Sequence, residues 1–236
     1  MRAQRTLAVL MVVVLAAVAA GCKVTAEDIE TWKGTIKGPG KIVAVLKADK
    51  YPLDLRVKAG LALVEMDRSD VNGLNELSNA LSSGRIDPAV RTQIVEGMSP
   101  GLVALMRGNG QAPQQAAGGD APPPSPVQIR AKDASFLVIT YASPAVRQQL
   151  TVGIIGWYVE DFNGRALVGN YSAEQIVRAL GAPAAAVLVD AMNAHMPKEA
   201  LTKIAELIGQ LADAAGKVRA ADRIVAIERE MEAPPF

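Results

Sequence analysis

The 236-residue chain contains a single histidine, His195, and a single cysteine, Cys22. A lone histidine excludes zinc motifs that combine several histidines, and we expect Cys22 to serve as a membrane anchor, as argued below, and not as a partner of His195. Asp190 could pair with His195 in acid–base chemistry, and a solvated histidine in a turn is the alternative.

Aromatic residues make up only 4% of the sequence, and alanine is abundant. This composition favours close helix packing over a β-sandwich.

Motifs for phosphate and calcium binding are incomplete. A phosphate-binding loop over residues 34–42 would need glycine at position 35 and serine or threonine at position 42, where the chain has Thr35 and Ile42. The stretch 67–73 fails as a calcium loop because its fifth and sixth positions are Val71 and Asn72. We therefore expect no catalytic residue, no metal and no cofactor, and we do not expect an enzyme.

The N-terminus has the pattern of a secretory signal peptide. Arg2 and Arg5 precede an unbroken apolar run over residues 7–20. This run is shorter than the roughly 18 to 20 residues that a helix needs to span a bilayer. A buried core helix is the alternative, but it would lack polar positions on any face. We expect residues 1–21 to be cleaved from an exported protein.

Cys22 follows Ala19, Ala20 and Gly21, and these four residues resemble the lipobox of bacterial lipoproteins. The resemblance implies that the thiol of Cys22 carries a diacyl group and that acylated Cys22 becomes the N-terminus, a palmitate-type anchor to the membrane. Ala19 stands where the family more often has leucine. The alternative is ordinary secretion with cleavage after Ala19, which leaves Cys22 as a free thiol. The resemblance to enterobacterial lipoproteins implies that aspartate after the cysteine would signal retention in the inner membrane, so Lys23 at this position favours the outer membrane, with the protein facing the periplasm.

The mature chain is close to neutral. Cleavage removes two of the 25 basic side chains and none of the 24 acidic ones. A neutral domain lacks the electrostatic footprint for binding nucleic acid or anionic lipid headgroups. No small-molecule substrate is evident from the sequence.

Residues 108–128 are rich in proline, glycine, glutamine and alanine and contain almost no large apolar side chain. Such a segment cannot bury enough surface to offset the entropy lost on ordering. We expect a flexible linker here, which would divide the mature chain into halves at 22–107 and 129–236.

Both halves have helical periodicity. One apolar stripe runs from Leu55 to Met66 in a helix that begins near Pro52. Further helix starts are expected at Thr25, Pro39, Asp87, Ser143 and Ser172. The strand-like runs at 136–142 and 151–159 lack strict alternation, and we interpret both as buried helix. The expected fold class is all-α.

The segments 87–94 and 143–150 share five of eight residues, and a weaker version occurs around Arg56. Arg56 and Arg91 are 35 residues apart, and Arg147 follows at the same spacing once the linker is subtracted. These features resemble HEAT-like helical repeats, which implies an α-solenoid with these arginines on the exposed first turn of every second helix. An irregular helical bundle is the alternative.

The only aromatic cluster contains Trp157 and Tyr158, with Gly153 and Gly156 permitting close approach of another helix. If exposed, these aromatic residues are candidate contacts for a partner protein, and core packing is the alternative. The sequence as a whole predicts a membrane-anchored periplasmic lipoprotein that acts as a protein-binding scaffold for another envelope protein. The alternatives are a pilotin-like assembly helper and an enzyme with an unrecognised acidic site.

Overall fold

A computed structural model describes residues 23–66, 68, 70–108 and 123–232. Within these residues the chain forms α-helices joined by turns and one 3-10 helix, without any strand, and the all-α expectation is confirmed. The α-helices are α2 (Ala26–Lys33), α3 (Gly38–Lys47), α4 (Leu53–Glu65), α5 (Gly73–Ser82), α6 (Pro88–Met106), α7 (Pro126–Val138), α8 (Pro144–Val159), α9 (Phe162–Arg165), α10 (Ala173–Leu180), α11 (Ala182–Ala191), α12 (Lys198–Leu211) and α13 (Ala214–Glu232), and the 3-10 helix is η1 (Ile139–Tyr141).

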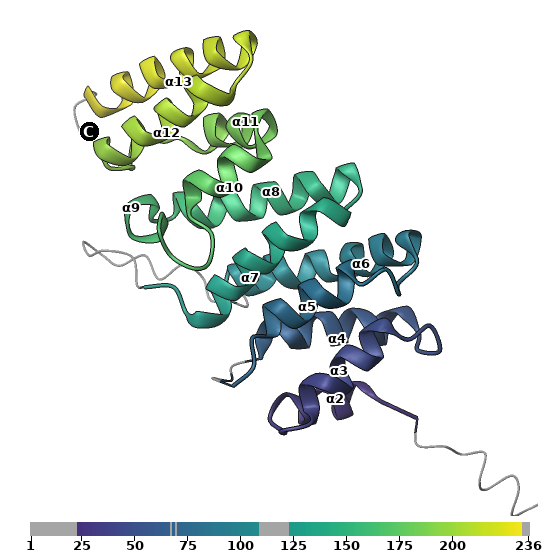
Figure 1. The fold of residues 1–236 in the computed structure, drawn as a ribbon. Coiled ribbons are helices and arrows are strands. Elements are labelled where there is room, and N and C mark those ends of the chain that lie inside the picture. The colour runs from purple at the N-terminus through teal and green to yellow at the C-terminus, as the bar shows by residue number, and fades with distance from the viewer. Residues whose placement is uncertain (1–22, 67, 69, 109–122, 233–236) are drawn as a thin grey trace, which may run out of the picture.

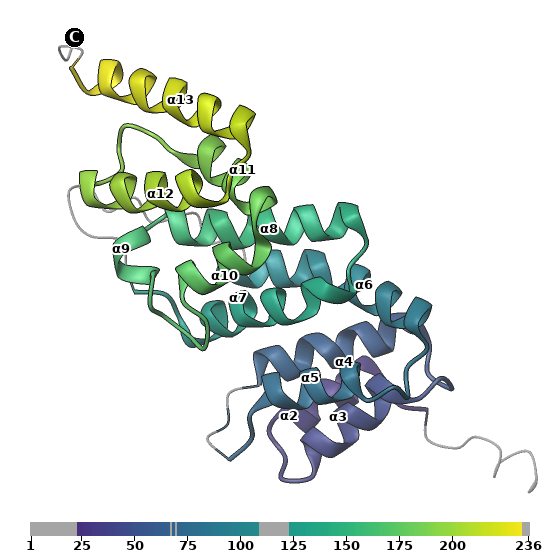
Figure 2. The same cartoon turned by 45° about the horizontal axis from the view of Figure 1, so that its top comes forward.

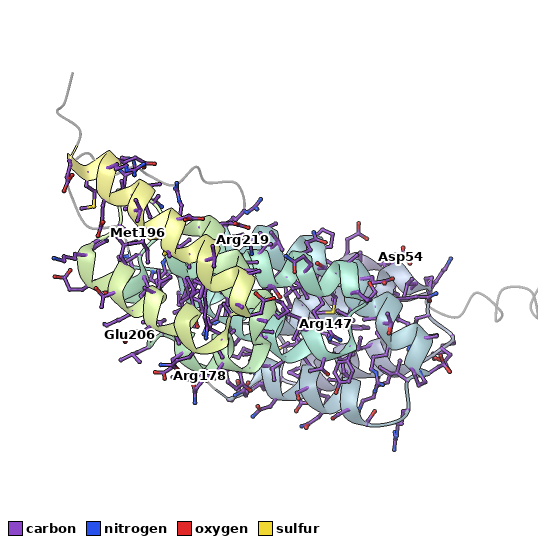
Figure 3. The ribbon with its side chains drawn as sticks, turned by 90° about the horizontal axis from the view of Figure 1, so that it is seen from above. Asp54, Arg147, Arg178, Met196, Glu206 and Arg219 are labelled. Atoms are coloured by element: carbon purple, nitrogen blue, oxygen red, sulfur yellow. The ribbon has the colours of Figure 1, made fainter. Side chains whose placement is uncertain are left out.

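The helices follow one another along an elongated molecule, from α2 in purple at one end to α13 in yellow at the other (Figure 1). One series of contacts joins α4 to α6, α6 to α8, α8 to α11 and α11 to α13. A second series joins α3 to α5 and α5 to α7, and α10 contacts α12. The turned view shows the same progression (Figure 2). Viewed from above, Asp54 of α4 and Glu206 of α12 lie toward opposite ends of the long axis (Figure 3).

Side-chain caps fix the starts of several helices. Thr25 and Ser172 each form a reciprocal capping box with the third residue of α2 and α10. Asp87 accepts hydrogen bonds from two backbone N–H groups at the start of α6. These caps satisfy N–H groups that have no partner within the helix. The helix starts expected at Thr25, Asp87 and Ser172 are confirmed.

Helix α7 begins at Pro126, inside the segment that we expected to be linker. Ser125 caps it through a capping box with Gln128, and proline occupies the first helical position. Gln128 also donates a hydrogen bond to the carbonyl oxygen of Met106, at 3.1 Å, which joins α7 to the end of α6. Helix α7 contacts α4, α5 and α6, so the chain on either side of the linker packs together.

The apolar stripe of α4 is buried as expected, with Leu63 fully inaccessible and Leu55 and Met66 nearly so. Gly60 allows α4 to approach α6, because an added Cβ would lie 2.5 Å from the sulfur atom of Met98. The runs at 136–142 and 151–159 are helical, although the first one ends in η1. Among the described residues, no helix is both long and apolar enough to cross a membrane.

Candidate functional site

The proposed lipid attachment residue, Cys22, lies outside the described residues. The described chain starts at Lys23, which is exposed, and Thr25 caps α2 shortly afterwards. Any group attached at Cys22 would therefore lie within a few residues of the first helix.

Trp157 and Tyr158 belong to the core of the molecule. Trp157 is 2% exposed and Tyr158 is fully buried, and their rings meet edge to face at 5.0 Å. Neither side chain is available to a partner protein, so the core-packing alternative describes them. Gly153 does allow close helix packing, because a Cβ added there would lie 2.9 Å from the methyl group of Met106. A Cβ added at Gly156 would have no such neighbour within 4 Å.

The aromatic pair covers a buried ion pair that the sequence analysis did not single out. Lys132 is fully buried and Asp133 is 2% exposed, and Nζ of Lys132 lies 2.6 Å from Oδ1 of Asp133. The ammonium group lies 5.6 Å from the ring centroids of both Trp157 and Tyr158. Such placement over ring faces stabilises a cation electrostatically.

The ion pair fixes the loop between α9 and α10. Lys132 donates hydrogen bonds of 2.8 Å to the carbonyl oxygens of Val168 and Tyr171. Asp133 accepts the backbone N–H of Asn170 at 2.8 Å. Gly169 has a φ of +93°, and an added Cβ would lie 2.8 Å from both charged groups. The loop therefore requires glycine where it passes over the ion pair.

Burial lowers the pKa of the Lys132 ammonium, and its hydrogen bond to Asp133 opposes this shift. Burial raises the pKa of the Tyr158 hydroxyl, and the negative charge of Asp133 raises it further. The Tyr158 hydroxyl donates a hydrogen bond of 3.1 Å to the carbonyl oxygen of Tyr171. These bonds indicate a structural role for the cluster, because each links α7 or α8 to the same loop.

A pocket of about 330 Å³ lies beside this cluster, between α7, the loop before α5 and the loop before α10. Its charged lining residues already have partners in the protein: Arg68 binds Asp70 through two hydrogen bonds, Asp133 pairs with Lys132, and Arg130 donates to carbonyl oxygens at the end of α4. Each of these charged side chains therefore already has a hydrogen-bonding or ionic partner within the protein.

The expectation that Arg56 occupies an exposed first turn is wrong. Arg56 is 3% exposed, and its Nε donates a 3.0 Å hydrogen bond to the carbonyl oxygen of Leu46 in the last turn of α3. Arg91 is partly buried, and its Nη1 donates a 3.0 Å hydrogen bond to the carbonyl oxygen of Leu81 in the last turn of α5. Both arginines satisfy carbonyl groups at a helix end, which cations stabilise. Arg147 alone is exposed as expected.

His195 is exposed in the turn between α11 and α12, where its backbone N–H donates to the side chain of Asn193. Asp190 is also exposed, at the end of α11. This environment matches a solvated turn histidine. The described part of the chain contains no group of three or more histidine, cysteine, aspartate or glutamate residues placed to hold a metal ion.

No family model matches the chain, and no curated protein or solved structure matches it either.

Proposed function

We propose that this protein is a lipid-anchored scaffold of the bacterial cell envelope, attached through Cys22 and facing the periplasm. The apolar leader and the lipobox-like residues 19–22 support the anchor. The helical array would bind another envelope protein. Arrays of this kind offer long surfaces for extended partners, and contacts between their own helices are mainly local.

A helical-repeat architecture is supported by the agreement between two helix pairs. Helices α3 and α5 begin 35 residues apart at Gly38 and Gly73, and both glycines are buried. Helices α4 and α6 begin at the same spacing. Arg56 and Arg91 each donate to the carbonyl oxygen ten residues earlier. We infer that these pairs are two units of a variant HEAT-like array.

The observation that carries the protein-binding proposal is the outer side of α13. Val218, Val225 and Met231 are 63%, 43% and 55% exposed. Val218 and Val225 are two turns apart and therefore share a face of the helix. Asp222 and Arg229 are exposed on the same side, so this surface combines apolar and charged side chains. Apolar side chains bordered by charged ones are typical of a protein–protein interface, and this surface lies far from α2 (Figure 1).

Site-specific photocrosslinking in cells tests this surface. A photoreactive residue at Val218 or Val225 of the full-length protein should capture one defined envelope protein, identifiable by mass spectrometry. The matched control places the same residue at Glu206, an exposed position on α12. Equal capture from all three positions, capture of lipid or peptidoglycan alone, or an adduct with a second copy of this chain would contradict the proposal.

Mass spectrometry of protein purified from membranes tests the anchor separately. The expected N-terminus is an acylated Cys22, without residues 1–21. An intact leader, or an unmodified Cys22 thiol, would show that the protein is not attached in this way.

A further inference from the structure

The turn between α2 and α3 holds an apolar side chain out into solvent. Ile36 is 87% exposed. The turn is fixed by backbone hydrogen bonds from Thr35 to Trp32, at 3.1 Å, and from Gly38 to Thr35, at 3.0 Å. An added Cβ at Gly38 would lie 1.7 Å from the carbonyl oxygen of Trp32, so the backbone is closely packed here. Ile36 therefore points outward because the turn is tight, and it has no core position to occupy.

Basic and aromatic residues flank Ile36 in the sequence. Lys37 and Lys41 are exposed, whereas Trp32 packs partly against the hydrophobic core and is partly exposed. The ammonium group of Lys41 lies 5.0 Å from the centroid of the Trp32 ring. Among the described residues, neither Lys37 nor Lys41 forms an ion pair, whereas Lys33 pairs with Glu30 and Glu65. We call Trp32, Ile36, Lys37 and Lys41 the α2–α3 tip.

The net charge of the whole chain does not favour anionic lipids, but this local combination of side chains is suited to a membrane surface. Tryptophan has an apolar ring with one polar group and is enriched where bilayers meet water. A lysine can lay its apolar stem along the same boundary while its ammonium group stays near lipid phosphates. Basic residues close to a bilayer are attracted to anionic headgroups. The exposed isoleucine supplies the apolar contact that such docking needs.

The position of the tip brings it within reach of the proposed anchor. Helix α2 begins at Ala26, four residues after Cys22, which is a span of about 14 Å at full extension. The helix itself has eight residues and is about 12 Å long. If α2 lies along the bilayer, the tip at its far end therefore reaches the headgroups. Of the acidic groups on α2, Glu30 binds Lys33 and Lys58 and Asp28 forms the N-terminal cap, while Glu27 is exposed in the first turn, at the end of the helix away from the tip.

We propose that the α2–α3 tip docks on the anionic headgroups of the membrane to which Cys22 is anchored, an inference that rests on the proposed lipid anchor. Trp32 and Ile36 occupy the interface, and Lys37 and Lys41 contact lipid phosphates. The anchor alone would leave the array free to rotate above the bilayer. A second contact fixes its orientation and directs α13 away from the membrane.

The two tryptophans of the chain allow a direct test with the full-length lipoprotein. A Trp157→Phe variant leaves Trp32 as the fluorophore, and a Trp32→Phe variant leaves the buried Trp157 as the matched control. Each is reconstituted into vesicles of phosphatidylethanolamine and phosphatidylglycerol with a quencher attached to the lipids. Trp32 emission should fall by roughly half, because interfacial side chains lie about 5–10 Å into the headgroup boundary. Trp157 emission should stay unchanged.

Charge reversal then tests the role of the lysines. Lys37→Glu combined with Lys41→Glu, in the Trp157→Phe background, should remove the quenching of Trp32. The control Lys203→Glu, at an exposed position on α12, should preserve it. Quenching should also weaken in vesicles of phosphatidylcholine alone, which carry no net negative charge.

Flotation of the same vesicles separates the two proposals. If the protein floats with the vesicles but Trp32 is quenched no more than Trp157, the docking inference is wrong while the anchor stands. If Trp32 is quenched equally in the charge-reversed variant, docking does not use the lysines and the anionic-headgroup inference is overturned. Failure of the protein to float would contradict the anchor itself.

Discussion

Helix pairs α3–α4 and α5–α6 are built alike, whereas the following pair, α7–α8, is held together differently. In each of the first two pairs the second helix begins 15 residues after the first. An arginine in its first turn then reaches the carbonyl oxygen ten residues earlier. In each pair the first helix begins with a buried glycine that lies against the end of the preceding helix.

In the third pair the starts of α7 and α8 are 18 residues apart, because α7 has 13 residues where α3 and α5 have ten. Arg147 occupies the position equivalent to Arg56 and Arg91, but it is exposed and donates no side-chain hydrogen bond within the described part of the chain. Tyr141 of η1 instead receives the guanidinium of Arg91 over its ring, at 4.3 Å. The connections 48–52, 83–87 and 139–143 are equally long, so the third pair differs in the length of its first helix and in the η1 conformation of its connection.

The largest loss of unfolding free energy is expected at the buried Lys132–Asp133 ion pair, which belongs to the third helix pair. Replacing Lys132 with methionine would leave Asp133 buried without its counter-ion, which should lower the free energy of unfolding by about 3–5 kcal/mol. Chemical denaturation measures this change. The control Lys198→Met, at an exposed position, should be close to neutral. A small loss for Lys132→Met would show that the ion pair does not hold α7 to the loop.

Arginine replacement tests the comparison directly. Arg56→Met should cost about 1.5–3 kcal/mol, since the carbonyl of Leu46 loses a charged hydrogen-bond donor in a buried site. Arg147→Met should cost less than about 0.5 kcal/mol, as expected for an exposed side chain. Equal losses of unfolding free energy for the two variants would contradict the distinction between the pairs.

Replacing the buried glycine at the start of α5 should lower stability by a similar or smaller amount than replacing Arg56. An added Cβ at Gly73 would lie 2.0 Å from the carbonyl oxygen of Leu63, so Gly73→Ala should cost about 1–3 kcal/mol by forcing the backbone apart. Gly40→Ala is the matched control, because nothing lies within 4 Å of that position in α3. It should leave the melting temperature unchanged or raise it, since alanine favours helix.

The smallest effect concerns an ion-pair cluster confined to the first part of the array. Hydrogen bonds from Lys33 and Lys58 lower the pKa of Glu30 below its usual value. This contribution to stability is therefore present above the pKa of an unfolded glutamate and is lost as the pH falls through the lower folded value. Glu30→Gln should remove that part of the acid dependence, by well under about 1 kcal/mol, because Glu30 is largely exposed. Denaturation at several pH values measures it, and an unchanged pH profile would contradict the assignment.

Local signals in the sequence were sufficient to predict where helices begin. Thr25, Asp87 and Ser172 act as the caps that their spacing predicted. The start of α7 was missed although Ser125, Pro126 and Gln128 carry the same signal, because the proline-rich composition of the preceding residues was extended too far. A helix cap is a local hydrogen-bond pattern, so the sequence can predict it. The average composition of a segment does not locate the residue at which the next helix begins.

Partners that are distant in sequence could not be predicted. The burial of Arg56 depends on where the end of α3 lies, and the burial of Lys132 depends on a loop about 36 residues further on. Adjacent opposite charges in a helix usually indicate a solvated face. The small residues Ala131, Ala134 and Ser135 beside the ion pair are the signal in the sequence that indicates close packing around this helix. All three are buried in the structure.

The order of contacts also affects how the chain folds. Most helices pack on helices that are near them in the sequence, so few distant segments have to meet before native structure forms. A low contact order of this kind is associated with rapid folding. A chain that emerges with its N-terminus first could therefore add each new helix to a platform that is already folded, and would expose little unpaired apolar surface on the way.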